Sequence, residues 1–162
     1  MERPEALRWS ADNCTISGAL DVVGDRATFL VMREVFAGVR RFDDIRLRTG
    51  IARQVLSVRL GRLVGEGLLR RHDYQEPGQR RRWEYRLTPK GFDLYPVLVA
   101  LLDWGDRYAA DAAGPAVTAR HRDCGGRVHA VLRCDAGHDV PGMREVHFTV
   151  GPGARLREPL TA

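Results

Sequence analysis

Residues 50–88 constrain the fold of this chain more than any other segment, and they read GIARQVLSVRLGRLVGEGLLRRHDYQEPGQRRRWEYRLT. Leu56, Leu60 and Leu63 recur at spacings of four and three, so they share one face of a predicted helix over 52–65. A strand over 68–74, a turn at 76–78 and an alternating strand over 82–87 are expected next. The segment therefore predicts a helix that leads directly into a β-hairpin with arginines near its tip.

This order of elements is typical of a winged helix-turn-helix. In that fold one helix enters the major groove of DNA, and the hairpin, called the wing, reaches the neighbouring backbone. Further helices are predicted at 17–23, at 26–36 with Asp25 as the N-cap, and at 41–48 with Phe42, Ile45 and Leu47 turned inward. We therefore expect an α+β, mainly α fold, with a C-terminal dimerisation helix and a small β-rich tail.

The dimerisation helix is predicted after the wing. Thr88 and Pro89 provide the N-cap and first position of a helix that Pro96 must break, and a longer helix then runs from 96 to about 110. The longer helix carries more apolar surface than a solvent-facing helix tolerates, so a second copy of the chain is its expected cover. The residues predicted at this interface are Leu98, Leu101, Leu102 and Trp104.

The charge of the chain favours a polyanionic partner. The net charge is +5 and the pI about 9.6, and Lys90 is the only lysine. The arginines gather at 40–41, 46–48, 53–62, 70–71 and 80–86. No apolar run reaches the roughly 20 residues of a membrane span, and the first residues lack the apolar core of a signal peptide. We expect a cytoplasmic protein with no membrane partner and with its three cysteines reduced.

Polar side chains on two elements are the candidates for DNA contacts. On the helix over 52–65 they are Arg53, Gln54, Ser57 and Arg62. Arginine and glutamine there suit the edges of guanine and adenine. On the wing they are Arg80, Arg81 and Arg82, which are expected to anchor phosphates or to probe the minor groove. The competing interpretations are a solvated helix face and a solvated charge run at a loop tip.

The composition changes after Asp111, so we divide the chain into a DNA-binding and dimerisation domain over 1–111 and a small β-rich tail over 112–162. Strand-like pieces lie at 128–132 and 146–150. The tail also holds His121 and Cys124, spaced as His-x2-Cys, and Cys134 and His138, spaced as Cys-x3-His. Two such pairs provide the four ligands of a tetrahedral structural zinc. The alternative is a degenerate zinc-ribbon-like element whose strands pack without metal.

The residues from Cys14 to Tyr108 resemble the HxlR family of bacterial winged helix-turn-helix regulators. The matching pieces are Cys14, LDVVG at 20–24, RRFDDI at 40–45, GI at 50–51, VLS at 55–57, RL at 59–60, Leu63, EGL at 66–68, Tyr85, LTPKG at 87–91 and WG at 104–105. The resemblance implies a homodimer that binds a palindromic operator and responds to small molecules or reactive species. The chain departs from the family at 25–27, where it has Asp-Arg-Ala and relatives often carry Gly-Lys-Trp.

The resemblance also makes Cys14 the candidate sensor thiol. An N-terminal cysteine in members of this family can respond to oxidants or electrophiles, and a thiolate near cationic groups is primed for that reaction. Asp12 and Asp21 against Arg8 give Cys14 neighbours of mixed charge in the sequence. The alternative interpretation is an inert, half-buried cysteine.

These observations predict a dimeric, sequence-specific DNA-binding transcriptional regulator whose partners are a double-stranded operator, a second copy and a small-molecule effector. The alternative is a winged-helix module that binds an acidic protein instead of DNA. An enzyme is not expected, because the sequence has no glycine-rich phosphate loop, no nucleophile elbow and no His-x3-His pair.

Overall fold

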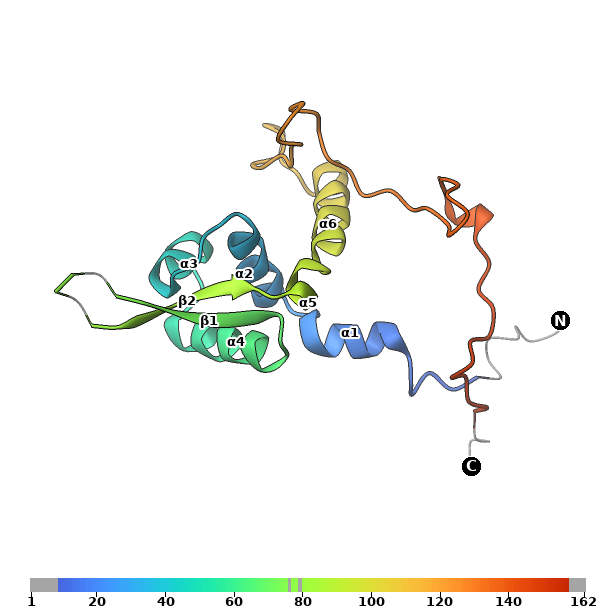
Figure 1. Ribbon diagram of the computed structural model, residues 1–162. Coiled ribbons are helices and arrows are strands. Elements are labelled where there is room, and N and C mark those ends of the chain that lie inside the picture. Colours follow the sequence, from blue (N-terminus) through green and yellow to red (C-terminus); the bar gives the residue numbers. More distant parts are fainter. Residues whose placement is uncertain (1–8, 76, 79, 158–162) are drawn as a thin grey trace. The chain divides into compact units, whose positions relative to one another are not determined.

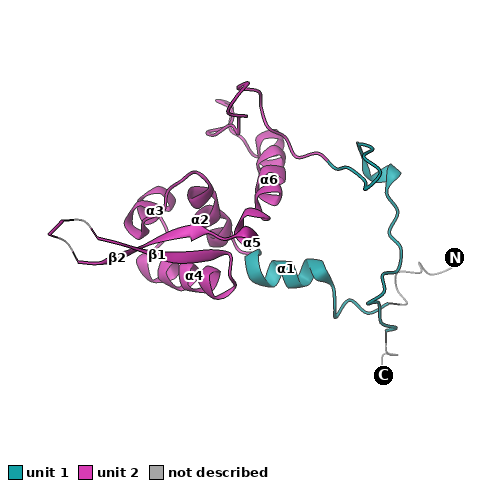
Figure 2. Cartoon of the chain, viewed as in Figure 1, with its two compact units in different colours: residues 1–24, 132–162 teal, residues 25–131 magenta. Residues whose placement is uncertain are grey.

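The computed structural model describes residues 9–75, 77–78 and 80–157, and their contacts divide the chain into two units. One unit spans residues 25–131, and the other joins residues 1–24 to residues 132–162 (Figure 2). The first unit holds the helices α2 to α6 and the two strands, while the second holds α1, Thr15–Val23. This division by contacts runs through the predicted tail, whose expected start at 112 came from composition alone.

Helix α2, Arg26–Phe36, begins where the sequence predicts it. Asp25 caps it, because its carboxylate accepts hydrogen bonds from the Thr28 amide at 3.0 Å and the Thr28 hydroxyl at 2.6 Å. Val31 and Met32 on this helix are fully buried, and Val35 nearly so. Helix α2 therefore forms the centre of the larger unit, and it contacts α3, α4, α6 and β2.

Helices α3, Phe42–Thr49, and α4, Arg53–Gly65, form the helix-turn-helix (Figure 1). The turn between them includes Gly50, whose φ of +67° is a left-handed conformation that favours glycine. The residues predicted to face inward are fully buried at Ile45, Leu56, Leu60 and Leu63. Leu47 was expected among them, but its side chain is 83% exposed, because it lies two positions from Ile45 and so projects from a different side of the helix.

The two strands, β1 over Leu69–Tyr74 and β2 over Arg82–Leu87, form an antiparallel hairpin with Leu69 opposite Leu87 and Tyr74 opposite Arg82. This hairpin is the predicted wing. Arg41 forms an isolated bridge with Glu84, so the chain just before α3 adjoins β2. Helix α4 contacts β1, whereas α2 and α3 contact β2. Helix α4, which corresponds to the predicted recognition helix, and the wing therefore pack against each other, and both pack against α2.

A short helix, α5 over Pro89–Phe92, and a long one, α6 over Tyr95–Tyr108, follow the wing. Thr88 caps α5 through the amide of Gly91 at 3.0 Å, as predicted. Gly91 lies so close to the residue before β1 that a Cβ there would be 2.1 Å from the carbonyl oxygen of Leu68. The expected break falls at residues 93–94, which leaves Pro96 in the first turn of α6, where proline is tolerated.

The tail differs from the expectation of a β-rich element. Between residues 112 and 157 the structure has two hairpin-like bridges, Arg120–Arg127 and Arg133–Asp139, a bridge from Leu156 to Trp9, and a 3-10 turn over Met143–Glu145. The strands expected at 128–132 and 146–150 do not form in this described region. Strands gain stability from packing one face on a core, and here Phe148 is 93% exposed.

Candidate nucleic-acid interface

Helix α4 presents the predicted DNA-reading residues to solvent. The buried face with Leu56, Leu60 and Leu63 fixes the helix against α2 and β1, so the opposite face must lie outward. Arg53, the first residue of α4, is 75% exposed at its side chain. Gln54, Ser57 and Arg62 are exposed as well. All four predicted positions are therefore accessible from solvent.

The wing presents the second group of predicted residues, Arg80, Arg81 and Arg82, all of them exposed. Arg82 is the first residue of β2, and Arg80 and Arg81 lie in the loop before it. The guanidinium of Arg81 pairs with the carboxylate of Asp73 at 3.1 Å. That of Arg82 pairs with Asp43 at 3.7 Å. The wing is therefore basic, but part of its charge is paired within the chain.

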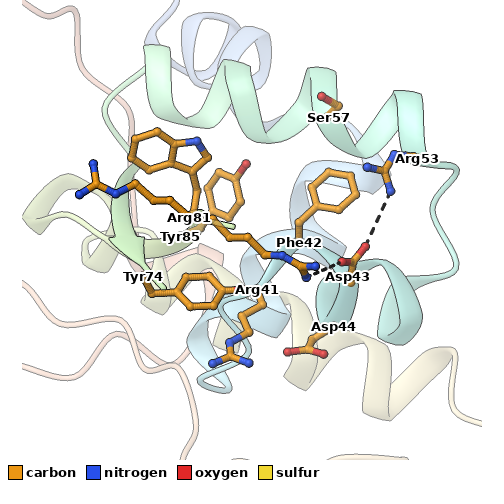
Figure 3. A pocket seen from close by; sticks show the side chains of 11 residues that line it. Arg41, Phe42, Asp43, Asp44, Arg53, Ser57, Tyr74, Arg81 and Tyr85 are labelled. Atoms are coloured by element: carbon orange, nitrogen blue, oxygen red, sulfur yellow. Dashed lines mark ion pairs between the residues drawn. The ribbon is translucent and has the colours of Figure 1, made fainter. Parts of the chain in front are cut away.

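A hollow of about 680 Å³ lies where the recognition helix, α3 and the wing meet (Figure 3). Basic and aromatic side chains line most of it. Four residues predicted to contact DNA, Arg53, Ser57, Arg81 and Arg82, lie on its walls. The others are Arg41, Phe42, Asp43, Asp44, Tyr74, Trp83 and Tyr85. The fold thus brings part of the helix candidates and part of the wing candidates to one place, whereas Gln54, Arg62 and Arg80 are not among the lining residues.

Aromatic rings support two of the arginines in the hollow. The guanidinium of Arg41 lies 4.5 Å from the centre of the Tyr74 ring, and that of Arg53 lies 5.3 Å from the centre of the Phe42 ring. Such cation–π contacts favour a guanidinium without consuming its hydrogen-bond donors. Arg41, Tyr74 and Asp43 were not among the predicted site residues. The basic pair at 40–41 was visible in the sequence, but nothing in the sequence placed it beside Tyr74.

Two buried or half-buried carboxylates hold the helices that carry the site. Glu34 on α2, only 1% exposed at its side chain, accepts hydrogen bonds from Arg48 on α3 at 2.9 Å and from Arg33 at 2.9 Å. Burial opposes ionisation of Glu34, but the two arginines outweigh it and lower the pKa of its carboxyl. Asp25 similarly pairs with Arg59 on α4 at 2.8 Å. Burial of Asp25 is outweighed by Thr28 and Arg59, so the pKa of this carboxyl is lowered too.

The predicted dimer helix α6 has the apolar exposure that was expected of it. Leu101 and Trp104 are exposed, and Leu98 and Leu102 are half-buried. An apolar hollow of about 390 Å³ opens between α2 and α6, and these three leucines lie on its wall together with Phe29 and Phe36. None of the helices in the described part of the chain is long and apolar enough to cross a membrane.

The predicted sensor, Cys14, is an exposed free thiol at the N-cap position of α1. Its side chain makes no capping hydrogen bond. The other two cysteines are also exposed and free. All three are therefore accessible to solvent.

The predicted zinc ligands occur as two close pairs, one in each unit. In the larger unit, Cys124 Sγ lies 3.5 Å from His121 Nδ1. The turn that carries this pair is closed by a hydrogen bond of 2.9 Å from the Gly125 amide to the His121 carbonyl. In the other unit, Cys134 Sγ lies 3.6 Å from His138 Nδ1, within a turn closed by the Cys134 amide on the His138 carbonyl at 3.0 Å. In the described part of the chain, no three His, Cys, Asp or Glu side chains gather into a metal-binding group.

The larger unit also anchors the first of these turns to α6. Asp103 accepts a hydrogen bond from the Ala130 amide at 2.9 Å and lies 3.1 Å from His129 Nδ1, and Arg127 pairs with Asp106. The Ala130 amide, followed by His129, lowers the pKa of the Asp103 carboxyl. The segment over 119–130 is thus held against α6.

Comparison with known proteins gives matches to one family of regulators. The sequence profile of the HxlR-like helix-turn-helix family matches residues 22–113. Relatives from Mycobacterium bovis and Mycobacterium tuberculosis strain H37Rv, both named HTH-type transcriptional regulators, are 39% identical over 143 residues, which are 88% of this chain and 89% of theirs.

Solved structures agree with the sequence matches. The crystal structure of a proposed transcription factor superimposes with a TM-score of 0.74 at 31% identity, over 85% of this chain and 95% of that one. A second, from Pseudomonas aeruginosa, gives a TM-score of 0.59 at 34% identity, over 88% of this chain and 95% of that one. The redox regulator HypR in its reduced form gives 0.51 at 25% identity, over 57% and 91%. The predicted winged-helix fold and its family are confirmed.

Proposed function

This chain belongs to the HxlR-like helix-turn-helix family of transcriptional regulators, and from that premise we propose that it reads a specific DNA operator as a homodimer. The observation that carries the proposal is the convergence of the recognition helix and the wing. Arg53 and Ser57 of α4 and Arg82 of the wing line one basic hollow, so a single duplex contacts both elements.

We infer that the partner is DNA and not an acidic protein because the exposed residues of α4 suit both parts of DNA recognition. Gln54 can reach base edges in the major groove, while Arg53 and the wing arginines can reach phosphates. An acidic protein would require only the basic residues, whereas a glutamine in the first turn of the helix also suits the edge of adenine. Arg62 and Ser57, also exposed on α4, complete this face as phosphate contacts.

A gel shift with the DNA upstream of the gene for this protein tests the proposal. We expect a retarded complex that excess unrelated duplex does not remove, because specific sites bind roughly 10³-fold or more tighter than other DNA. Genomic fragments captured by the protein and then sequenced would give the operator. If a folded dimer retained no fragment above background, the alternative of a winged-helix module that binds an acidic protein would be favoured.

We further propose that α6 forms the two-fold interface of the dimer. The exposed Trp104 and Leu101 and the apolar hollow beside Leu98 and Leu102 form one surface of a kind that monomers rarely leave open. A second copy that places the same surface against it would cover both. Dimerisation would also set the spacing between two recognition helices, which a palindromic operator requires.

We propose that Cys14 makes the regulator responsive to oxidants. The thiol is exposed and free, and the HypR structures show that a redox regulator shares this fold. Treatment with diamide should change the DNA affinity of the wild type and leave that of Cys14→Ser unchanged. An equal response in both proteins would assign the effect to Cys124 or Cys134, or to damage elsewhere.

We also propose that His121 with Cys124, and Cys134 with His138, act as zinc-ligand pairs. Zinc–sulfur and zinc–nitrogen bonds of about 2.3 and 2.05 Å at a tetrahedral angle place the two ligand atoms roughly 3.6 Å apart. The two pairs have separations of 3.5 and 3.6 Å. Elemental analysis of the purified wild-type protein should find bound zinc. Cys124→Ser should lose the metal and Cys14→Ser should retain it, whereas metal-free wild type would contradict the proposal.

A further inference from the structure

Asp43 lies between the two DNA-facing elements and contacts both (Figure 3). It is the second residue of α3, and its carboxylate oxygens lie 3.8 Å from the guanidinium of Arg53 and 3.7 Å from that of Arg82. These arginines are the first residues of α4 and of β2, and they are 29 positions apart in the sequence. One carboxylate therefore forms long ion pairs with two guanidinium groups that belong to different elements.

Two guanidinium groups that converge on one anion form the arrangement that also binds a phosphate. A phosphate diester has two non-bridging oxygens that share one negative charge, and arginine forks match such oxygens well. Phe42 and Tyr74 provide aromatic walls, and Arg41 adds a further cation to the same hollow. In the free protein the carboxylate of Asp43 thus occupies the position between helix and wing that suits a backbone phosphate.

We propose that Arg53 and Arg82 together bind one DNA phosphate at the junction of recognition helix and wing, and that Asp43 competes with this phosphate as an internal mimic. The inference rests on the proposed DNA-binding function and assigns it a shared phosphate position. Binding of DNA requires both arginines to leave Asp43, so the carboxylate lowers the affinity for any duplex. Removing the charge of Asp43 therefore tightens DNA binding.

The size of the effect follows from the exposure of the groups. The side chains of Asp43, Arg53 and Arg82 are all more than half exposed. Ion pairs of this kind change an equilibrium by roughly 1.4- to 5-fold each. Two pairs broken on binding predict that Asp43→Asn binds DNA roughly 2- to 25-fold tighter at low salt. High salt should reduce the gain, because the pairs are screened.

Asp44→Asn is the matched control. Asp44 is the next residue, is exposed, lies in the same first turn of α3 and lines the same hollow. The Asp44→Asn substitution removes one negative charge, as Asp43→Asn does, but it leaves the ion pairs of Asp43 with Arg53 and Arg82 in place. Fluorescence anisotropy with a labelled duplex should show a smaller increase in DNA affinity for Asp44→Asn than for Asp43→Asn. Circular dichroism and the melting temperature of each variant verify that both remain folded.

A double-mutant cycle with Arg82→Ala provides the decisive result. Asp43→Asn should lose a large part of its gain in the Arg82→Ala background, while the gain from Asp44→Asn should persist there. Equal gains for the two asparagine variants, a gain independent of Arg82, or weaker binding by Asp43→Asn would each overturn the inference. Wild-type protein that binds no duplex at any salt concentration would instead refute the proposed function itself.

Discussion

Replacing the buried Glu34 by glutamine should destabilise the larger unit, because this carboxylate joins α2 to α3. The substitution keeps the size of the side chain and removes its charge. Arg33 and Arg48 then lose the anion that accepts their hydrogen bonds at 2.9 Å each. The glutamine oxygen can still accept one of these bonds, while its amide group faces the other guanidinium as a second donor.

The magnitude is set by how far the arginines can return to water. Hydrogen bonds to charged groups contribute about 1.5–3 kcal/mol each to stability, and breaking a fully buried pair costs about 3–5 kcal/mol. The arginines are about half exposed, 45% for Arg33 and 58% for Arg48, so water solvates them after the substitution. We therefore expect a loss of about 1–3 kcal/mol in the free energy of unfolding, near the lower of these ranges.

Urea denaturation followed by circular dichroism measures this loss. Glu145→Gln, in the exposed turn over Met143–Glu145, is the matched control and should change stability by less than about 0.5 kcal/mol. A cycle with Arg48→Gln should give a coupling energy of at least about 0.5 kcal/mol between positions 34 and 48. Glu34→Gln with wild-type stability, or with no coupling to Arg48, would show that the pair does not join the helices.

The pH dependence of the same variant provides an independent test. The pKa of the Glu34 carboxyl is lower in the folded state than in the unfolded chain. Its stabilising contribution is therefore fully present above the usual glutamate pKa, about 4.3, and is lost as the pH falls through the lowered folded value. The stability difference between wild type and Glu34→Gln should stay constant from neutral pH to about pH 5 and shrink below it. A difference that persists in strong acid would mean that packing, not charge, is responsible.

Three further outcomes are expected. Gln54→Ala should relax discrimination among operator sequences more than it weakens binding to unrelated DNA, since a base-edge contact is worth roughly 1–3 kcal/mol. Equal weakening on all sequences in anisotropy titrations would show that Gln54 contacts only the DNA backbone. Leu98→Glu and Leu101→Glu should each yield monomer in sedimentation and lose operator binding, and a DNA-competent dimer carrying both would exclude the α6 interface. Asp25→Ala should cost about 1–2 kcal/mol by thermal melting and Asp25→Asn less, because asparagine still caps α2; equal costs would assign the effect to the ion pair with Arg59.

Local sequence signals predicted the elements of the larger unit well. Asp25 and Thr88 have side chains that cap helices, and the structure uses both for this purpose. The alternating strand over 82–87 lies at the predicted residues, and the apolar face of 52–65 is buried at Leu56, Leu60 and Leu63. These features depend on neighbours within a few residues, and the sequence contains those neighbours.

Contacts between residues that are distant in the chain could not be predicted from the sequence. Nothing in the pattern places Asp43 beside both Arg53 and Arg82, because the contact arises only when α3, α4 and the wing pack together. The number of arginines in the wing does not show how many of them are paired within the chain. In the structure the guanidinium of Arg81 forms an ion pair with the carboxylate of Asp73. The predicted tail strands were wrong for a related reason. A short apolar run forms a strand only when a core covers one of its faces, and Phe148 has none.

The central claim is that the recognition helix and the wing contact one duplex together. The most direct test of this claim is the dependence of DNA affinity on salt concentration. Each phosphate contact contributes a slope of about −0.9 to a plot of log K against log salt concentration. Arg80→Ala/Arg82→Ala should therefore bind operator DNA with a slope shallower by about 1–2 than that of the wild type, and Arg53→Ala should also reduce the slope or relax the base preference. Identical slopes for the wild type and the wing variant would contradict the account, because the wing would then touch no phosphate.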